Sequence, residues 1–246
     1  NTKGGFEESN SIIIYNHGFP DASVSPYALQ EWKEVLAADG SEGAERSMPD
    51  HGFWASRFPR KLCEHVLKGF EGVTFVAFNT RGVPGSSVAQ PSKVEEAPAE
   101  FESKTLTRDL ADLEIVMKHW AVRCPKASRI VCGLSTGAFL ALGYAGRPDL
   151  QPSGGISGCF TLACVQDIPS SVTLDFSGDQ IEEAARTGFV SQAFFPFQGA
   201  ENPQKWKLSA GYLESYNAFP SMKELGMQLT APTLILHGQD DKYFLN

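Results

Sequence analysis

The sequence predicts an α/β fold, in which a mostly parallel sheet carries helices on both faces. Short, almost continuously apolar runs alternate along the chain with segments of helical periodicity. Such runs are typical of central parallel strands, because both faces of those strands are buried. Strand–helix alternation in turn favours crossover connections and therefore a parallel sheet. With 246 residues and a hydrophobic content of 42%, the chain is long and apolar enough for a full core.

Each predicted element has its own pattern. The five expected strands are Ser11–Asn16, Val73–Asn79, Arg129–Cys132, a weaker Gly155–Ala163, and Pro232–Leu236. The helices between them are Phe58–Phe70, Ser103–Val122 and Thr136–Tyr144. The second of these helices has the clearest pattern, a single apolar stripe at helical spacing formed by Leu106, Leu110, Leu113, Val116 and Met117.

Two segments interrupt this alternation. Asp21–His51 is polar and follows the first strand. Residues 167–220 contain a predicted helix over Gly178–Val190, the aromatic run FVSQAFFPFQG and a second helix around Leu208–Tyr216. This length suits a cap over a pocket, and surface helices without a lid role are the alternative. We therefore expect a core from residues 1–166, a small helical cap from 167–220, and a returning core segment from 221–246.

Composition excludes several classes of protein. The net charge of −8 argues against a nucleic-acid partner, and no apolar stretch approaches the roughly 20 residues of a membrane span. The five cysteines include no CxxC pair, which disfavours a disulfide framework or a zinc site and favours a cytoplasmic or other reducing compartment. Because the chain begins with Asn1, the sequence does not reveal a targeting segment. We expect a small-molecule substrate with neither metal nor cofactor, and we make no prediction of oligomeric state.

The stretch GLSTG, residues 133–137, lies between a predicted strand and a predicted helix. A sharp strand-to-helix turn there would expose the Ser135 hydroxyl at the carboxyl edge of the sheet. Side chains at Gly133 and Gly137 would collide with the neighbouring strand or helix. The Gly-x-Ser-x-Gly pattern is weak alone, but this context makes Ser135 a candidate nucleophile.

Three further stretches follow the other strands at the same sheet edge. YNHGFPD, residues 15–21, would place the backbone N–H of Phe19 opposite that of Thr136, giving two donors for an oxyanion. FNTRGVPGSS, residues 78–87, is a glycine-rich loop after the second strand. LILHGQDDKYF, residues 234–244, ends the last strand and carries Asp241 three residues after Gly238. Asp240 beside Asp241 could suggest a metal, but no cluster of histidine or glutamate supports one.

In this order, the four motifs resemble those of α/β-hydrolase-fold enzymes. The resemblance covers most of the chain and is closest to the cap-bearing branch that contains epoxide hydrolases, meta-cleavage product hydrolases and proline iminopeptidases. It implies that Ser135 is the nucleophile and Asp241 the triad acid, that Phe19 and Thr136 form the oxyanion hole, and that residues 167–220 form the cap. Asp167, which follows the fourth strand, is the reserve for the acid, as in some lipase-like relatives.

Two of the four motifs depart from the family pattern. HGFPD is most typical of epoxide hydrolases and haloalkane dehalogenases, whose nucleophile is aspartate; serine here favours acyl transfer. The loop after the second strand usually begins with aspartate, where this chain has Asn79, and we expect no catalytic consequence.

The general base is the missing part of the triad. The family order is serine, acid, histidine, whereas all five histidines precede Asp241. We expect structural roles for each of them: His17, His51, His65, His119 and His237. The catalytic histidine is therefore expected beyond Asn246, in a chain that is incomplete at both ends.

The sequence thus predicts a serine hydrolase that cleaves an ester, thioester or amide through an acyl-enzyme on Ser135. The aromatic run in the cap favours a small hydrophobic substrate. A proline-iminopeptidase-like aminopeptidase is one alternative, because cap carboxylates such as those in DQIEEAA hold a substrate amine in those relatives. A catalytically inactive binding or scaffolding protein of the same fold is the other.

Overall fold

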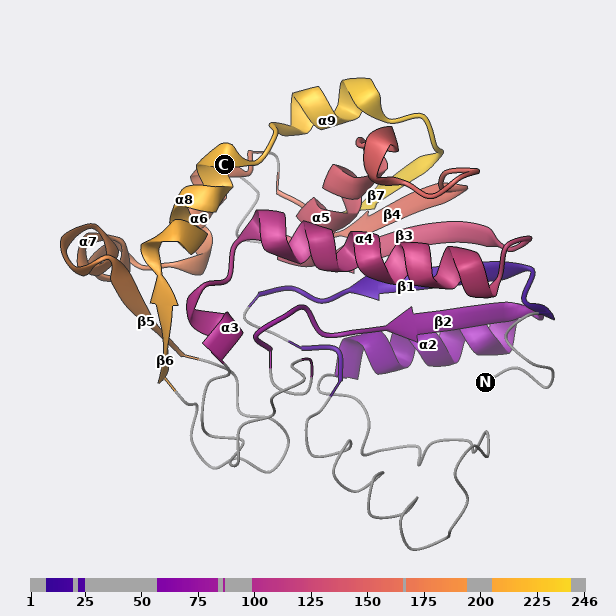
Figure 1. The fold of residues 1–246 in the computed structure, drawn as a ribbon, viewed down its shortest axis with the longest axis horizontal. Helices are drawn as coiled ribbons and strands as arrows, with labels where there is room; N and C mark the ends of the chain where they lie inside the picture. Colours follow the sequence, from indigo (N-terminus) through magenta and orange to yellow (C-terminus); the bar gives the residue numbers. More distant parts are fainter. Residues whose placement is uncertain are drawn as a thin grey trace, which may run out of the picture.

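A five-stranded parallel sheet forms the centre of the computed structural model, which describes residues 8–19, 22–24, 57–83, 86, 99–165, 167–193 and 205–239. The strand order is β2-β1-β3-β4-β7 (Figure 1). The strands are β1 (Ser11–Asn16), β2 (Val73–Ala77), β3 (Ser128–Leu134), β4 (Gly158–Leu162) and β7 (Thr233–Leu236). The parallel pairing confirms the predicted α/β class, and each predicted strand is present.

Helices cover both faces of this sheet. The three predicted helices are α2 (Arg57–Gly69), α4 (Leu106–Arg123) and α5 (Thr136–Ala145), with the short α3 (Ala99–Glu102) before α4 and α9 (Met222–Gln228) before β7. Helices α4 and α5 lie on one face and α2 lies on the other (Figure 1). The hydroxyl of Thr105 caps α4 by accepting a hydrogen bond from the N–H of Arg108.

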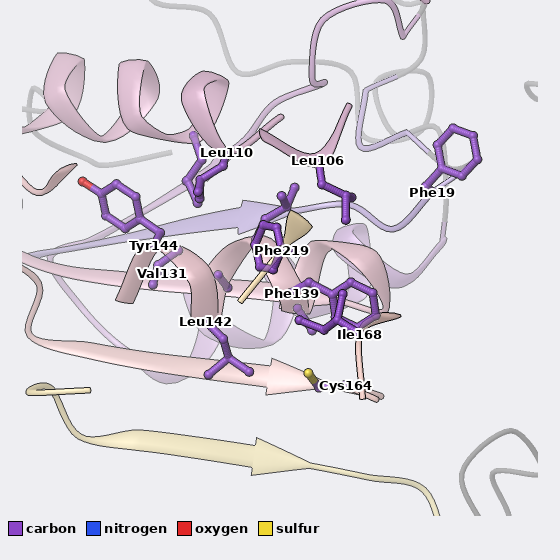
Figure 2. Packing of buried hydrophobic residues seen from close by; sticks show 14 of the residues in the cluster. Phe19, Leu106, Leu110, Val131, Phe139, Leu142, Tyr144, Cys164, Ile168 and Phe219 are labelled. Atoms are coloured by element: carbon purple, nitrogen blue, oxygen red, sulfur yellow. The ribbon is translucent and has the colours of Figure 1, made fainter. Parts of the chain in front are cut away.

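The core explains why β1 is continuously apolar. Successive side chains of a strand point to opposite faces. Ile12 and Ile14 accordingly join the larger cluster beneath α4 and α5, while Ile13 and Tyr15 join the cluster around Val66 of α2. The larger cluster draws on the sheet, α4 and α5, as Figure 2 shows with Val131, Leu110, Leu142 and Phe139. All ten residues of α5 are buried, which places this helix in the centre of the fold.

The described residues between 167 and 220, namely 167–193 and 205–220, lie beyond the carboxyl ends of the parallel strands (Figure 1). They contain η3 (Pro169–Ser171), α6 (Val172–Asp175), α7 (Gly178–Thr187), β5 (Phe189–Ala193), β6 (Lys205–Ser209) and α8 (Ala210–Ala218). The helix predicted over 178–190 is present, but its predicted C-terminal end was wrong. Helix α7 stops at Thr187, because Gly188 adopts a left-handed φ of 79°. The second helix begins at Ala210 rather than Leu208.

The antiparallel pair β5–β6 was not predicted. It buries Val190 opposite Leu208 in register, and both side chains are inaccessible to solvent. Residues 194–200, which hold most of the predicted aromatic run, lie outside the described residues, as do residues 25–51 of the predicted polar segment. Within the described ranges, no helix combines the length and apolar character that crossing a membrane requires.

Candidate active site

Ser135 adopts a backbone conformation that L-residues rarely populate. It lies between β3 and α5 with φ 54° and ψ −122°. Such a conformation costs on the order of 1–3 kcal/mol and persists only where the surroundings enforce it. Hydrogen bonds on both sides enforce it here: Ser135 N–H donates to Leu162 O of β4 at 3.0 Å, and Ala138 N–H donates to Ser135 O at 2.8 Å.

Glycine on either side of Ser135 is a steric requirement of this turn. A Cβ atom at Gly133 would lie 2.0 Å from Gly137 O. A Cβ atom at Gly137 would lie 2.4 Å from Asn16 O and 2.5 Å from His17 O, both on the chain that leaves β1. The two glycines therefore allow close backbone contacts within the turn and between the turn and the chain that leaves β1.

The loop after β1 packs directly on the turn that carries Ser135. A Cβ atom at Gly18 would lie 3.2 Å from Ser135 Cβ. The parallel register of β1 and β3, which pairs Asn16 with Gly133, brings the two loops to the same edge of the sheet. Phe19 and Thr136 follow immediately and are both buried. The two residues predicted as oxyanion donors therefore lie on adjoining loops.

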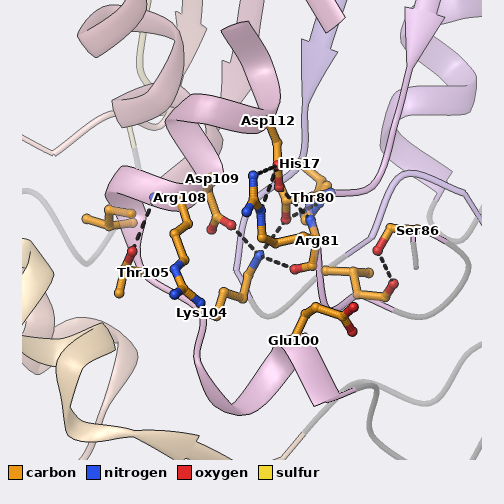
Figure 3. A network of polar contacts seen from close by, with 12 residues as sticks. His17, Thr80, Arg81, Ser86, Glu100, Lys104, Thr105, Arg108, Asp109 and Asp112 are labelled. Atoms are coloured by element: carbon orange, nitrogen blue, oxygen red, sulfur yellow. Dashed lines mark hydrogen bonds and ion pairs between the residues drawn. The ribbon is translucent and has the colours of Figure 1, made fainter. Parts of the chain in front are cut away.

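A buried polar network holds the loop after β1 (Figure 3). His17 Nδ1 lies 2.8 Å from Gly18 O, and its Nε2 accepts a hydrogen bond from Thr80 N–H at 3.1 Å. The Thr80 hydroxyl lies 3.2 Å from the same Nε2 and accepts from Lys104 Nζ at 2.6 Å. Lys104 Nζ also donates to Arg81 O at 3.1 Å and to Asp109 Oδ1 at 2.5 Å.

Burial shifts the ionisation of this network. It lowers the pKa of His17 to about 4, and the nearby Lys104 ammonium adds to that effect. His17 is therefore neutral at pH 7. Burial also raises the pKa of Asp109 to about 6, against the opposing influence of Lys104. Asp109 forms an ion pair with Lys104, and both side chains are almost inaccessible to solvent.

The glycine-rich loop after β2 is tied to its surroundings on two sides. Asn79 Oδ1 accepts from Ser23 N–H and Val24 N–H, at 2.8 and 2.9 Å, and its Nδ2 donates to Val24 O at 2.8 Å. Aspartate at this position could not make the last of these bonds. Arg81 forms an ion pair with Asp112 of α4, which accepts from the Arg81 side chain and from its backbone N–H.

Aromatic side chains from residues 167–220 cover the Phe19 ring. Its centroid lies 4.5 Å from that of Tyr212 on α8 and 6.1 Å from that of Phe176. Tyr216, also on α8, donates from its hydroxyl to the Asp175 carboxylate at the end of α6. Burial raises the pKa of Asp175, against the effect of this hydrogen bond. A buried aromatic cluster with one partly buried carboxylate thus packs beside the loop after β1.

Other predicted residues lie apart from this cluster or outside the described residues. Asp241 lies outside the described residues, and so do Pro20 and Asp21 after Phe19. Asp167, the reserve acid, is exposed in the turn after β4, where its backbone oxygen accepts from Ser170 and Ser171. Of the other histidines, His51 is undescribed; His65 on α2, His119 on α4 and His237 after β7 are exposed.

Sequence reasoning missed the polar residues beneath the loop. Thr80, Lys104 and Asp109 were not singled out as functional, nor were Asp175 and Tyr216. One signal was available: the carboxylate of Asp109 falls on the apolar stripe of its helix and is buried with Leu106 and Leu110. A charged residue at a core position implies a buried partner.

Comparisons with known proteins identify the fold. Models of protein families gave no match, and curated proteins gave no significant match. Among solved structures, the chain resembles a soluble variant of monoglyceride lipase from Saccharomyces cerevisiae in complex with a substrate analog, at 14% identity and a TM-score of 0.60, covering 98% of this chain and 71% of that one. It also resembles Est1E from Butyrivibrio proteoclasticus with bound ferulic acid, at 15% identity and a TM-score of 0.56, covering 99% and 75%. The chain therefore has the α/β-hydrolase fold.

Proposed function

We propose that the protein is a serine hydrolase that cleaves an ester, thioester or amide through an acyl-enzyme on Ser135. The observation that carries this proposal is the backbone of Ser135, held at φ 54° between β3 and the buried helix α5. Such conformations cluster at active sites. In this fold the turn presents a hydroxyl at the carboxyl edge of the sheet, where a substrate carbonyl can approach it.

In this mechanism, Ser135 Oγ attacks the carbonyl carbon and the carbonyl oxygen becomes an oxyanion. The backbone N–H groups of Phe19 and Thr136 stabilise that negative charge. A histidine oriented by Asp241 takes the hydroxyl proton and returns it to the leaving alcohol, thiol or amine. Water, activated by the same histidine, then releases the acyl group. Asp167 is the reserve for the acid.

His17 does not supply this base. Its Nδ1–H donates to Gly18 O, and its Nε2 accepts from Thr80. With a pKa of about 4, it is also a weak acceptor for a serine proton near pH 7. We therefore assign His17 to the support of the oxyanion loop.

The proposed acyl pocket is hydrophobic. Phe176 and Tyr212 line the side of Phe19 that faces residues 167–220, which we propose as the cap of the active site. Est1E, of the same fold, was solved with the aromatic acid ferulic acid. A substrate beside this buried aromatic cluster would meet an apolar environment, which favours an aryl or medium-length acyl group. On α7, Asp179 and Glu182 are exposed, which supports a solvated helix face for DQIEEAA rather than an amine site of an aminopeptidase.

Labelling of the full-length protein with a fluorophosphonate probe tests this proposal. We expect rapid modification that peptide mapping assigns to Ser135, is abolished by heat denaturation, and is absent from Ser135→Ala. The exposed Ser170→Ala is the matched control and should label like the unmodified protein. A panel of p-nitrophenyl esters and aminoacyl anilides would then separate the esterase from the aminopeptidase. Failure to label folded, intact, full-length protein would refute the hydrolase and favour a binding protein.

A further inference from the structure

Lys104 is the donor in each of its three hydrogen bonds. An ammonium group has three donors and no acceptor. Lys104 uses all three, toward Asp109 Oδ1, Arg81 O and Thr80 Oγ1, at 2.5, 3.1 and 2.6 Å. The Thr80 hydroxyl therefore accepts from Lys104, and its single proton is left for the neighbouring atom, His17 Nε2, at 3.2 Å.

The contacts of His17 select one tautomer, and the Thr80 hydroxyl is one of them. Two donors of Thr80, the hydroxyl and the backbone N–H, converge on Nε2, which must then carry a lone pair. The ring proton of the neutral imidazole accordingly lies on Nδ1. From there it donates to Gly18 O at 2.8 Å, because a carbonyl oxygen can only accept.

The last acceptor in this series of hydrogen bonds, Gly18 O, belongs to the peptide unit that also contains the proposed oxyanion donor. Gly18 C=O and Phe19 N–H are part of one planar peptide unit. In a trans peptide the two bonds point in opposite directions, so a hydrogen bond that fixes the carbonyl also fixes where the N–H points. Gly18 itself packs against Ser135.

We propose that Lys104 is a positioning residue of the oxyanion loop, acting through Thr80 and His17 on the Gly18–Phe19 peptide. Asp109 holds the ammonium in place, so that the relay runs Asp109, Lys104, Thr80, His17, Gly18. The effect of the relay on catalysis rests on the proposed function. Its effect on structure, which is to fix one tautomer of His17, is independent of that function.

The Thr80 hydroxyl is the link that can be removed most cleanly. Thr80→Val keeps the shape and deletes the hydroxyl, whereas Thr80→Ser keeps the hydroxyl. Should Thr80→Val fail to fold, the double variant Lys104→Met with Asp109→Leu serves instead, since removing both charges leaves no unpaired ion in the core. Glu114→Gln, which breaks an exposed ion pair with Lys118 on the same helix, is the control.

Two readouts are needed, in the full-length protein. The first is the ring nitrogen NMR spectrum of His17, for which we expect a protonated Nδ1, with proton exchange at least about 10-fold faster in Thr80→Val and restored in Thr80→Ser. The second is the rate of Ser135 modification by a fluorophosphonate, together with kcat and KM for a p-nitrophenyl ester. We expect Thr80→Val to lower the rate and kcat about 10-fold at unchanged KM, a part of the 10²–10³-fold that follows from losing a whole oxyanion donor.

Each outcome decides the proposal. Faster exchange of the His17 Nδ1 proton together with slower acylation of Ser135 in Thr80→Val, both restored in Thr80→Ser, supports the relay. A His17 spectrum and acylation rate equal to those of the unmodified protein overturn it, and so does a changed spectrum with an unchanged rate. If the unmodified protein does not react at Ser135, the proposed function has failed, and the His17 spectrum alone decides whether the relay fixes the tautomer.

Discussion

The pKa of His17 makes a quantitative prediction about stability. An unfolded chain protonates this histidine near pH 6.5, whereas the folded protein keeps it neutral down to about pH 4. Between these values the unfolded state binds more protons, so the free energy of unfolding must fall as the pH is lowered. Linkage gives a loss of about 2 kcal/mol between pH 7 and pH 4.5 from this residue alone. The carboxyls of Asp109, which is buried, and of Asp175, which is partly buried, have raised pKa values and act in the opposite direction.

The comparison that isolates His17 is a double difference. The free energy of unfolding in urea is measured at pH 7 and pH 4.5 for the unmodified protein and for His17→Asn, which can keep a donor close to the Nδ1 position. The carboxyl contributions occur in both proteins and cancel. The unmodified protein should lose about 2 kcal/mol more than His17→Asn over this range, and the exposed His65→Asn controls for the removal of a histidine. Equal losses, within about 0.5 kcal/mol, would refute a neutral, buried His17.

Three further perturbations address the site and its surroundings. Gly137→Ala places a Cβ 2.4 Å from a backbone oxygen of β1; labelling of the full-length protein should slow at least about 100-fold, and a normal rate would contradict the packed turn. Tyr216→Phe removes the hydroxyl that donates to the partly buried Asp175 carboxylate, so urea unfolding should show about 1–3 kcal/mol less stability; no change would mean that water replaces the lost hydrogen bond. Glu114→Gln breaks the exposed pair with Lys118 and should alter stability by less than about 0.5 kcal/mol, and a larger change in thermal unfolding would contradict that view.

The sequence was sufficient for the sheet and for the turn around Ser135, for physical reasons. Strands buried on both faces need apolar side chains at every position, so β1 is visible without any periodicity. Glycine at positions 133 and 137 is enforced by backbone contacts of 2.0 and 2.4 Å, which leaves a fixed spacing in the sequence. Local sterics of this kind can be read from residue types alone.

The rest depended on contacts between distant segments. The β5–β6 pair has an alternating pattern in KWKLS, with Trp206 and Leu208 buried, but five residues match a helix end equally well. Lys104 reaches Thr80, 24 residues earlier, only because the loop after β2 lies beneath α4. No spacing in the sequence encodes that approach.

The acyl-enzyme itself provides the most direct test of the serine hydrolase mechanism. Full-length protein is mixed with a p-nitrophenyl ester, quenched in acid within the first turnover, and digested for mass spectrometry. We expect a burst of about one equivalent of p-nitrophenol per chain, with the acyl group on the peptide that contains Ser135 and no acyl peptide in Ser135→Ala. Turnover of the ester without an acyl group on Ser135, or with undiminished turnover in Ser135→Ala, would contradict the mechanism.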